Sequence, residues 1–206
     1  MILIGQYDSP FTRRVGIALT LYEMSFEHRP WSIFGDADQV QEVNPLIRVP
    51  TLILDDGDVL IDSSAIIDYL DRVARKDQVL FPRHEPARHR ALKIAALACG
   101  LADKAVSLFY ERNLHSETSA QWEARCLSQI AATLHVLETD RAAQTAPWWF
   151  GEKPGHADIA VACVLRHATE AHPGLISPGP ALTAHCAALE ATPVFQAISQ
   201  AFIPPA

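Results

Sequence analysis

The sequence lacks the basic clusters and long apolar stretches that are typical of nucleic-acid-binding and membrane proteins. It has no basic cluster, and its 17 Lys and Arg against 24 Asp and Glu give a net charge of -7. Such a chain offers no electrostatic surface to nucleic acid or to an anionic membrane, so we expect neither as a partner. No stretch is apolar enough to span a bilayer, and the opening MILIGQYDSP has no basic leader. We therefore expect a cytoplasmic protein whose partners are small molecules or proteins.

Cysteine and histidine are present, but neither shows the spacing of a metal or disulfide site. The four cysteines fall in segments of helical pattern and form no CxxC pair, which is typical of buried thiols in a reducing compartment. Among the nine histidines, HEPARH and HATEAH both differ from the HExxH spacing of zinc sites. The sequence therefore predicts no disulfide and no metal.

The chain has 206 residues, of which 49% are hydrophobic, and this is enough to form a folded core. Its first eighty residues alternate between strand and helix patterns. A strand pattern in MILIGQY, residues 1–7, leads to Ser9-Pro10, a helix cap followed by a first-turn proline. The later elements are a strand at 25–31, a short helix in the polar stretch that follows, a hairpin over 49–61 around Asp56-Gly57, and a helix at 62–74.

Beyond Pro86 every long segment has a helical pattern. The predicted helices cover residues 87–112, 119–143, 156–171, 180–190 and 193–202. We therefore predict two domains, an α/β domain over 1–80 and an all-α domain over 87–206.

Four short motifs in this order resemble the cytosolic glutathione transferases. They are SPFTRRV at the first turn, NPLIRVPTL at 44–52, LIDSSAIIDYL at 60–70 and GHADIAVA at 155–162. The resemblance covers the whole chain, and the SPF turn is most similar to serine-type classes, notably the plant tau class and related bacterial proteins. It implies the glutathione transferase fold, with a thioredoxin-like N-terminal domain that binds glutathione and an all-α domain that completes the electrophile pocket. In GHADIAVA, Asp158 is expected to bond back to the helix entry.

The resemblance also implies a glutathione site in the first domain. A cis Val49-Pro50 bond would let the Val49 backbone pair with the cysteinyl part of glutathione, whereas the alternative is a trans proline at a strand edge. Ser63, at a helix N-terminus, would bind the γ-glutamyl carboxylate while Asp62 faces the α-ammonium, or both would only cap the helix. Arg48 would reach the glycyl carboxylate, or be a solvated surface arginine.

The thiol of glutathione needs a donor that stabilises its thiolate, and three hydroxyls compete for that role. Ser9 matches the SPF pattern directly, Thr12 lies in the first helical turn, and Tyr7 is expected to pack at the strand end. The simpler role for Ser9 is a helix cap. No cysteine precedes Cys99, so the mixed-disulfide chemistry of the cysteine-type classes is not expected.

As a function, the resemblance implies an enzyme that conjugates glutathione, its co-substrate, to small hydrophobic electrophiles, a detoxification reaction. A glutathione-dependent isomerase and a non-catalytic binding or regulatory protein of the same fold stay open. Relatives form two-fold homodimers, in which Asp103 would approach the partner's bound γ-glutamyl group. Candidate contacts to the electrophile are Phe11, Phe34, Leu108 and Tyr110, although an aromatic residue at helical spacing more often packs in the core.

Overall fold

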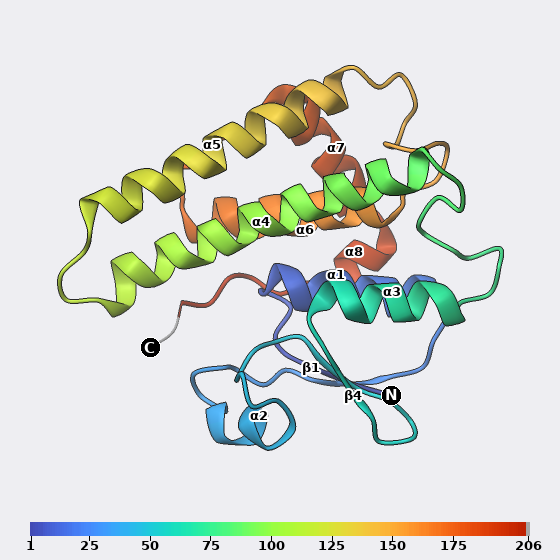
Figure 1. Cartoon of the computed structure of the whole chain (residues 1–206), viewed down its shortest axis with the longest axis horizontal. Coiled ribbons are helices and arrows are strands. Elements are labelled where there is room, and N and C mark those ends of the chain that lie inside the picture. The colour runs from blue at the N-terminus through green and yellow to red at the C-terminus, as the bar shows by residue number, and fades with distance from the viewer. Residues whose placement is uncertain (205–206) are drawn as a thin grey trace. The chain divides into compact units, whose positions relative to one another are not determined.

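A mixed four-stranded sheet forms the centre of the N-terminal unit (Figure 1). This computed structural model describes residues 1–204. In the sheet order β2-β1-β3-β4, β1 is parallel to β2 and antiparallel to β3, and β3 is antiparallel to β4. The strands are β1 (Ile2–Ile4), β2 (Glu27–Arg29), β3 (Thr51–Ile53) and β4 (Val59–Ile61). One row of the sheet pairs Ile4 with Thr51 and Thr51 with Ile61, so β1 ends, β3 begins and β4 ends at the same end of the sheet.

Two helices cover one face of this sheet, α1 (Pro10–Leu21) and α3 (Ser63–Val73), while α2 (Ala37–Val43) lies on the other side (Figure 1). α1 and α3 pack against each other through side chains that are almost completely buried. Because β1 and β4 run in the same direction, the helices that follow them begin at the same end of the sheet. Both helix starts were predicted, and Ser9 and Asp62 are their N-caps.

The predicted hairpin is present between β3 and β4. Gly57 has a φ of +89°, a conformation that L side chains rarely adopt, and the Leu54 N–H donates to the Asp58 carbonyl at 2.8 Å. The length of this turn sets the register that brings Ile61 opposite Thr51.

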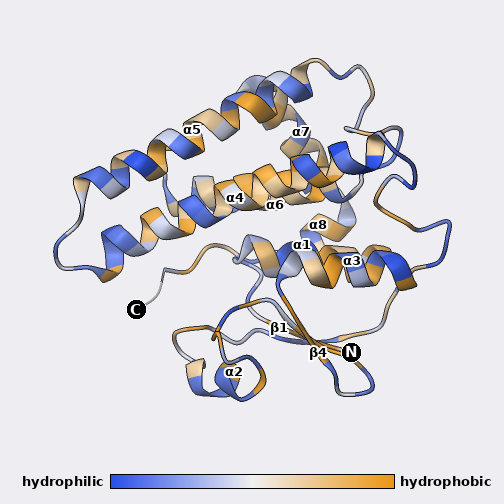
Figure 2. Ribbon diagram, viewed as in Figure 1, coloured by the Kyte–Doolittle hydropathy of each residue, from blue (hydrophilic) through white to orange (hydrophobic). Residues whose placement is uncertain are grey.

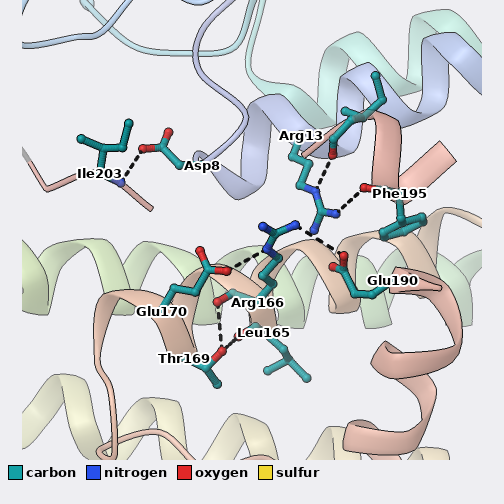
Figure 3. A network of polar contacts seen from close by, with 10 residues as sticks. Asp8, Arg13, Leu165, Arg166, Thr169, Glu170, Glu190, Phe195 and Ile203 are labelled. Carbon is teal, nitrogen blue, oxygen red and sulfur yellow. Dashed lines mark hydrogen bonds and ion pairs between the residues drawn. The ribbon is translucent and has the colours of Figure 1, made fainter. Parts of the chain in front are cut away.

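The last part of the described chain belongs to the N-terminal unit, although we predicted it in the helical domain. One unit comprises Met1–Leu80 and the segment from Thr192 onward, and the other is Phe81–Ala191. The predicted helix over 193–202 is only α8 (Pro193–Ala197). The reason is a buried contact with α1: Arg13 donates from Nε to the Ile198 carbonyl at 2.8 Å and from Nη2 to the Phe195 carbonyl at 2.9 Å (Figure 3).

The helical unit is built around one central helix. The helices of this unit are α4 (Ala87–Leu114), α5 (Ala120–Ala142), α6 (His156–Ala171) and α7 (Pro180–Glu190), and α6 is the central one. α6 packs against α4 and α7 and is buried along most of its length, whereas α5 shows hydrophilic residues on much of its surface (Figure 2). On α6, Arg166 forms ion pairs with Glu170 and with Glu190 of α7 (Figure 3).

A buried polar cluster fixes the start of α6. As predicted, Asp158 bonds back to the helix entry, accepting from the Gly155 N–H at 2.8 Å, and it also accepts from the Trp149 N–H at 3.0 Å. Arg141 donates from Nε to Nδ1 of His185 at 3.1 Å, and Nε2 of this imidazole is 3.4 Å from Asp158 Oδ1. Burial, with the charge of Arg141 as a second cause, lowers the pKa of His185 to about 4. His185 is therefore neutral, with its proton on Nε2, facing Asp158.

Three further findings concern residues 1–204. No helix in this range combines the length and apolar character needed to cross a membrane. The same residues contain no group of three or more His, Cys, Asp or Glu side chains that could hold a metal ion. All four cysteines are free thiols.

Candidate functional site

Three segments that carry predicted site residues meet where β1 ends. Gly5 has a φ of +125°, and a Cβ placed on it would lie 2.5 Å from Thr12 Oγ1 and 2.7 Å from Val49 Cβ. Only glycine fits this position, because both the backbone conformation and the space exclude a side chain. The first turn of α1 and the segment before β3 are therefore in direct contact with the end of β1.

Ser9 caps α1 and keeps its own hydroxyl hydrogen. Its Oγ accepts from the Thr12 N–H at 3.3 Å, and its own N–H donates to the Gln6 carbonyl at 3.2 Å. A serine hydroxyl has one donor and two acceptor positions, so accepting from the helix leaves the O–H free to donate elsewhere. The two roles considered for Ser9, helix cap and thiolate donor, are thus compatible in one geometry.

The two competing hydroxyls are placed less favourably. Tyr7 packs at the end of β1 as predicted: it is 9% exposed, and its ring stacks on His28 with a centroid distance of 3.9 Å. Burial raises the pKa of Tyr7 to about 12. Thr12 is completely buried, and its hydroxyl has no hydrogen-bond partner within residues 1–204. Ser9 is the only one of the three that is half-buried at a helix start.

The Val49-Pro50 peptide is cis, as predicted. The backbone before it is held by Thr51, whose hydroxyl donates to the Arg48 carbonyl at 3.1 Å and accepts from Asn44 Nδ2 at 3.0 Å. Val49 is half-buried and Arg48 is exposed. Roles for the Val49 backbone and for Arg48 in ligand binding stay predictions.

At the start of α3, Asp62 and Ser63 lie at the same end of the sheet as Val49. Asp62 has a φ of +66°, and its Oδ1 accepts from the Ser64 N–H at 2.7 Å, so it caps the helix. Ser63 is the first helical residue and is 4% exposed. Contact of Asp62 with a ligand ammonium stays a prediction.

The N-termini of α1 and α3 give this end of the sheet an affinity for anions. Unpaired backbone N–H groups and the helix dipole each favour negative charge at a helix start. No acidic residue lies in the first turn of either helix, although the Asp62 carboxylate at the N-cap of α3 accepts from the Ser64 N–H. The arrangement can therefore hold two anionic groups, one near each helix start.

The predicted electrophile contacts differ in their exposure. Phe11 is half-buried in the first turn of α1, and Phe34 is 45% exposed before α2. Leu108 of α4 is 0% exposed and so presents no surface to a ligand. Tyr110 of α4 is half-buried, and its ring makes an edge contact with Phe109.

Sequence reasoning missed three residues beside Ser9. Gly5 had a signal, since a lone glycine at the end of a strand pattern marks a close backbone approach. Asp8 accepts from the Ile203 N–H at 3.3 Å, and Gln200 Oε1 accepts from the Tyr7 N–H at 3.1 Å. Nothing in the local sequence signals these contacts, because their partners are almost two hundred residues away.

Comparison with known proteins gives consistent matches. Residues 3–77 match the family model described as glutathione S-transferase, N-terminal domain, and residues 120–188 match glutathione S-transferase, C-terminal domain. A maleylacetoacetate isomerase of Pseudomonas aeruginosa is 31% identical over 170 residues, 77% of either chain.

Two solved structures are similar over nearly their whole length. A glutathione S-transferase from Methylobacillus flagellatus KT, with GSH bound, is 26% identical, with a TM-score of 0.87 over 96% of this chain and 98% of that one. A holo maleyl pyruvate isomerase, described as a bacterial zeta-class glutathione S-transferase, is 26% identical with a TM-score of 0.82, covering 97% and 96% of the two chains.

Proposed function

Because this chain belongs to the glutathione S-transferase family, we propose that it binds glutathione at the shared end of β1, β3 and β4 and adds its sulfur to small electrophiles. One observation carries the proposal: the Ser9 hydroxyl, the Val49 backbone and two helix N-termini meet at this end of the sheet. The anionic groups of bound glutathione, its thiolate and its γ-glutamyl carboxylate, match the two helix starts.

Ser9 is the proposed thiolate stabiliser. A free thiol has a pKa of about 8.5, and lowering it by about two units requires roughly 2.7 kcal/mol of preference for the charged form. A hydrogen bond to a charged acceptor supplies about 1.5–3 kcal/mol, and a helix N-terminus adds up to about 1 kcal/mol. The hydroxyl that caps α1 is thus sufficient without a metal or a second acid.

The rest of the tripeptide is assigned to neighbouring groups. The Val49 backbone pairs with the cysteinyl residue in the manner of an added strand. Ser63 and the first N–H groups of α3 bind the γ-glutamyl carboxylate, Asp62 faces the α-ammonium, and Arg48 pairs with the glycyl carboxylate. Phe11 and Phe34, both on the N-terminal unit, are the proposed contacts for an apolar electrophile.

An isomerase is the second candidate, favoured by the isomerases among the similar proteins. Both reactions begin with attack of the same thiolate. In a transferase the new carbon–sulfur bond remains and glutathione is consumed. In an isomerase the thiolate adds to a conjugated double bond, the resulting single bond rotates, and elimination restores both the double bond and the thiolate.

Glutathione binding is tested first, by calorimetry and thermal shift. We expect sub-millimolar to millimolar affinity, weakened in Ser63→Ala. Absence of both heat and thermal shift at saturating glutathione would overturn the proposal.

A stoichiometry assay then separates the reactions. With an aromatic halide, a transferase consumes one glutathione per product; with a cis-configured conjugated keto acid, an isomerase changes the double bond without loss of free thiol. Binding without turnover of either class would instead identify a non-catalytic glutathione-binding protein.

We also propose a homodimer in the cytoplasm. Leu92 of α4 is 42% exposed beside small residues of the same helix, which suits an isologous contact with a second copy. The four free cysteines fit a reducing compartment. Sedimentation that gives a monomer at every concentration would contradict the dimer.

A further inference from the structure

We propose that Gln200 is a positioning residue that holds the turn carrying Ser9, through the segment of residues 198–204, here called the strap. This inference rests on the proposed function, because it assigns the strap to the thiolate site. The strap belongs to the N-terminal unit and has no regular secondary structure.

The strap is anchored at its start on α1. The buried Arg13 side chain is 2% exposed and donates to the carbonyls of Phe195 and Ile198, and its guanidinium lies 5.2 Å from the centre of the Phe195 ring (Figure 3). Gly16 allows this approach, since a Cβ there would lie 2.8 Å from the Tyr7 ring and 3.1 Å from Ile198. The strap therefore begins against α1, at the glycine that the Tyr7 ring also approaches.

From this anchor the strap reaches the two residues that precede Ser9. Gln200 Oε1 accepts from the Tyr7 N–H at 3.1 Å. The Ile203 N–H donates to Asp8 Oδ2 at 3.3 Å, as Figure 3 shows. Within the turn, the Ser9 N–H donates to the Gln6 carbonyl at 3.2 Å, and at its start the Gly5 N–H donates to the Arg29 carbonyl at 2.9 Å. The strap adds two hydrogen bonds at Tyr7 and Asp8, which lie between the start of the turn and Ser9.

These bonds act on the chemistry in two ways. Gln200 supplies an acceptor for a backbone N–H that β1 no longer pairs, and so fixes the direction from which Ser9 leaves the strand. Ile203 binds the Asp8 carboxylate, whose negative charge lies one residue from Ser9 and would oppose a thiolate if it turned toward it. The strap thereby orients the hydroxyl donor and restrains the nearest anion.

The test compares two glutamines of the same segment. Gln200→Leu keeps the size of the side chain but removes the acceptor for Tyr7, and Gln196→Leu makes the same change at an exposed position of α8. The first readout is amide hydrogen exchange at Tyr7, which needs no ligand. We expect faster exchange of this amide in Gln200→Leu than in wild type or Gln196→Leu.

The second readout is the thiol of bound glutathione, titrated by its thiolate absorbance. In Gln200→Leu we expect its pKa to rise by about half a unit to one unit, and kcat at neutral pH to fall about three- to tenfold, as for a misplaced catalytic group. KM for glutathione should change less than about twofold, because the strap's hydrogen bonds go to Tyr7 and Asp8 and not to Val49 or Ser63. Gln196→Leu should match wild type in both.

Two results would overturn the inference: Tyr7 exchange that is the same in all three proteins, or a thiol pKa and kcat in Gln200→Leu that equal those of Gln196→Leu. An unchanged thiol pKa and kcat would overturn the inference even if Gln200→Leu melts at a lower temperature. Gln200 would then contribute to stability alone. If wild type does not bind glutathione, the proposed function fails. The exchange experiment still decides whether Gln200 holds the turn.

Discussion

The Thr12 N–H donates to the Ser9 hydroxyl at 3.3 Å, and the Trp122 N–H donates to the Ser119 hydroxyl at the same distance. The two serines therefore cap α1 and α5 in the same way, although only Ser9 lies at the candidate site. Alanine variants of these two serines therefore distinguish the stability lost with a helix cap from the activity lost with a thiolate donor.

We predict that Ser9→Ala and Ser119→Ala each lower the free energy of unfolding by about 1 kcal/mol, measured by urea denaturation. Only Ser9→Ala should raise the pKa of the bound glutathione thiol and reduce turnover at neutral pH, by about ten- to hundredfold. The defect should shrink as pH rises, because the thiolate then forms without help. Equal thiol titrations in Ser9→Ala and wild type would mean that the serine is only a cap.

The two buried threonines near the site should respond oppositely to loss of the hydroxyl. Thr12 Oγ1 has no hydrogen-bond partner in the described chain, whereas the Thr51 hydroxyl bonds with both Asn44 and Arg48. Thr12→Val should therefore raise the free energy of unfolding by about 1 kcal/mol, and Thr51→Val should lower it by about 1–3 kcal/mol. Turnover of Thr12→Val should stay within a few-fold of wild type. A destabilised Thr12→Val would indicate a partner for its hydroxyl.

At position 47, we predict that a glycine variant is more stable than an alanine variant. Ile47 has a φ of +48°, where a side chain costs about 1–2 kcal/mol, and glycine has no such cost. Ile47→Gly should therefore be more stable than Ile47→Ala by about 1 kcal/mol in chemical denaturation. At the neighbouring Leu46, which is not in this conformation, the order should reverse, since alanine loses less backbone entropy. The same order at both positions would contradict the strained backbone.

Acid should weaken the helical unit through His185. Its folded pKa of about 4 lies below the ordinary value of 6.5, so between these pH values the unfolded chain binds a proton that the folded chain does not. The free energy of unfolding should then fall by up to about 3 kcal/mol as pH drops through this window. Burial raises the pKa of Asp158, which acts in the opposite direction and reduces the net fall.

The control for this pH dependence is His185→Gln, whose amide can accept from Arg141 and donate to Asp158 without titrating. Urea midpoints measured between pH 4 and pH 7 should fall less steeply in this variant than in wild type. Parallel curves would show that His185 does not cause the acid sensitivity.

Local signals predicted the elements that end on caps and tight turns. Ser9-Pro10, Asp56-Gly57 and Asp62 mark points where the backbone needs a particular residue, and the structure has a helix or a turn at each. These signals act over a few residues, so they can be read without knowing the fold. The same holds for Asp158, whose bond to Gly155 spans three residues.

The contacts beyond this range could not be predicted from the sequence. The pattern after Pro193 extends a helix to 202, but α8 ends at Ala197, and the carbonyl of the next residue, Ile198, accepts from Arg13 across 185 residues. Likewise, a lone glutamine gives no indication that Gln200 accepts from Tyr7. Which hydroxyl can reach a ligand also depends on packing, since the structure buries Thr12 completely and leaves Ser9 half-buried.

The return of the chain to its first unit at Thr192 makes the helical unit an insertion within the α/β unit. A fragment cut after Leu80 would keep every strand but lose the Phe195 and Ile198 carbonyls that accept from the buried Arg13 side chain. The thiolate turn would lose Gln200 in the same cut. The α/β unit is therefore discontinuous in sequence. A fragment that ends at Leu80 would lack the part of this unit that begins at Thr192.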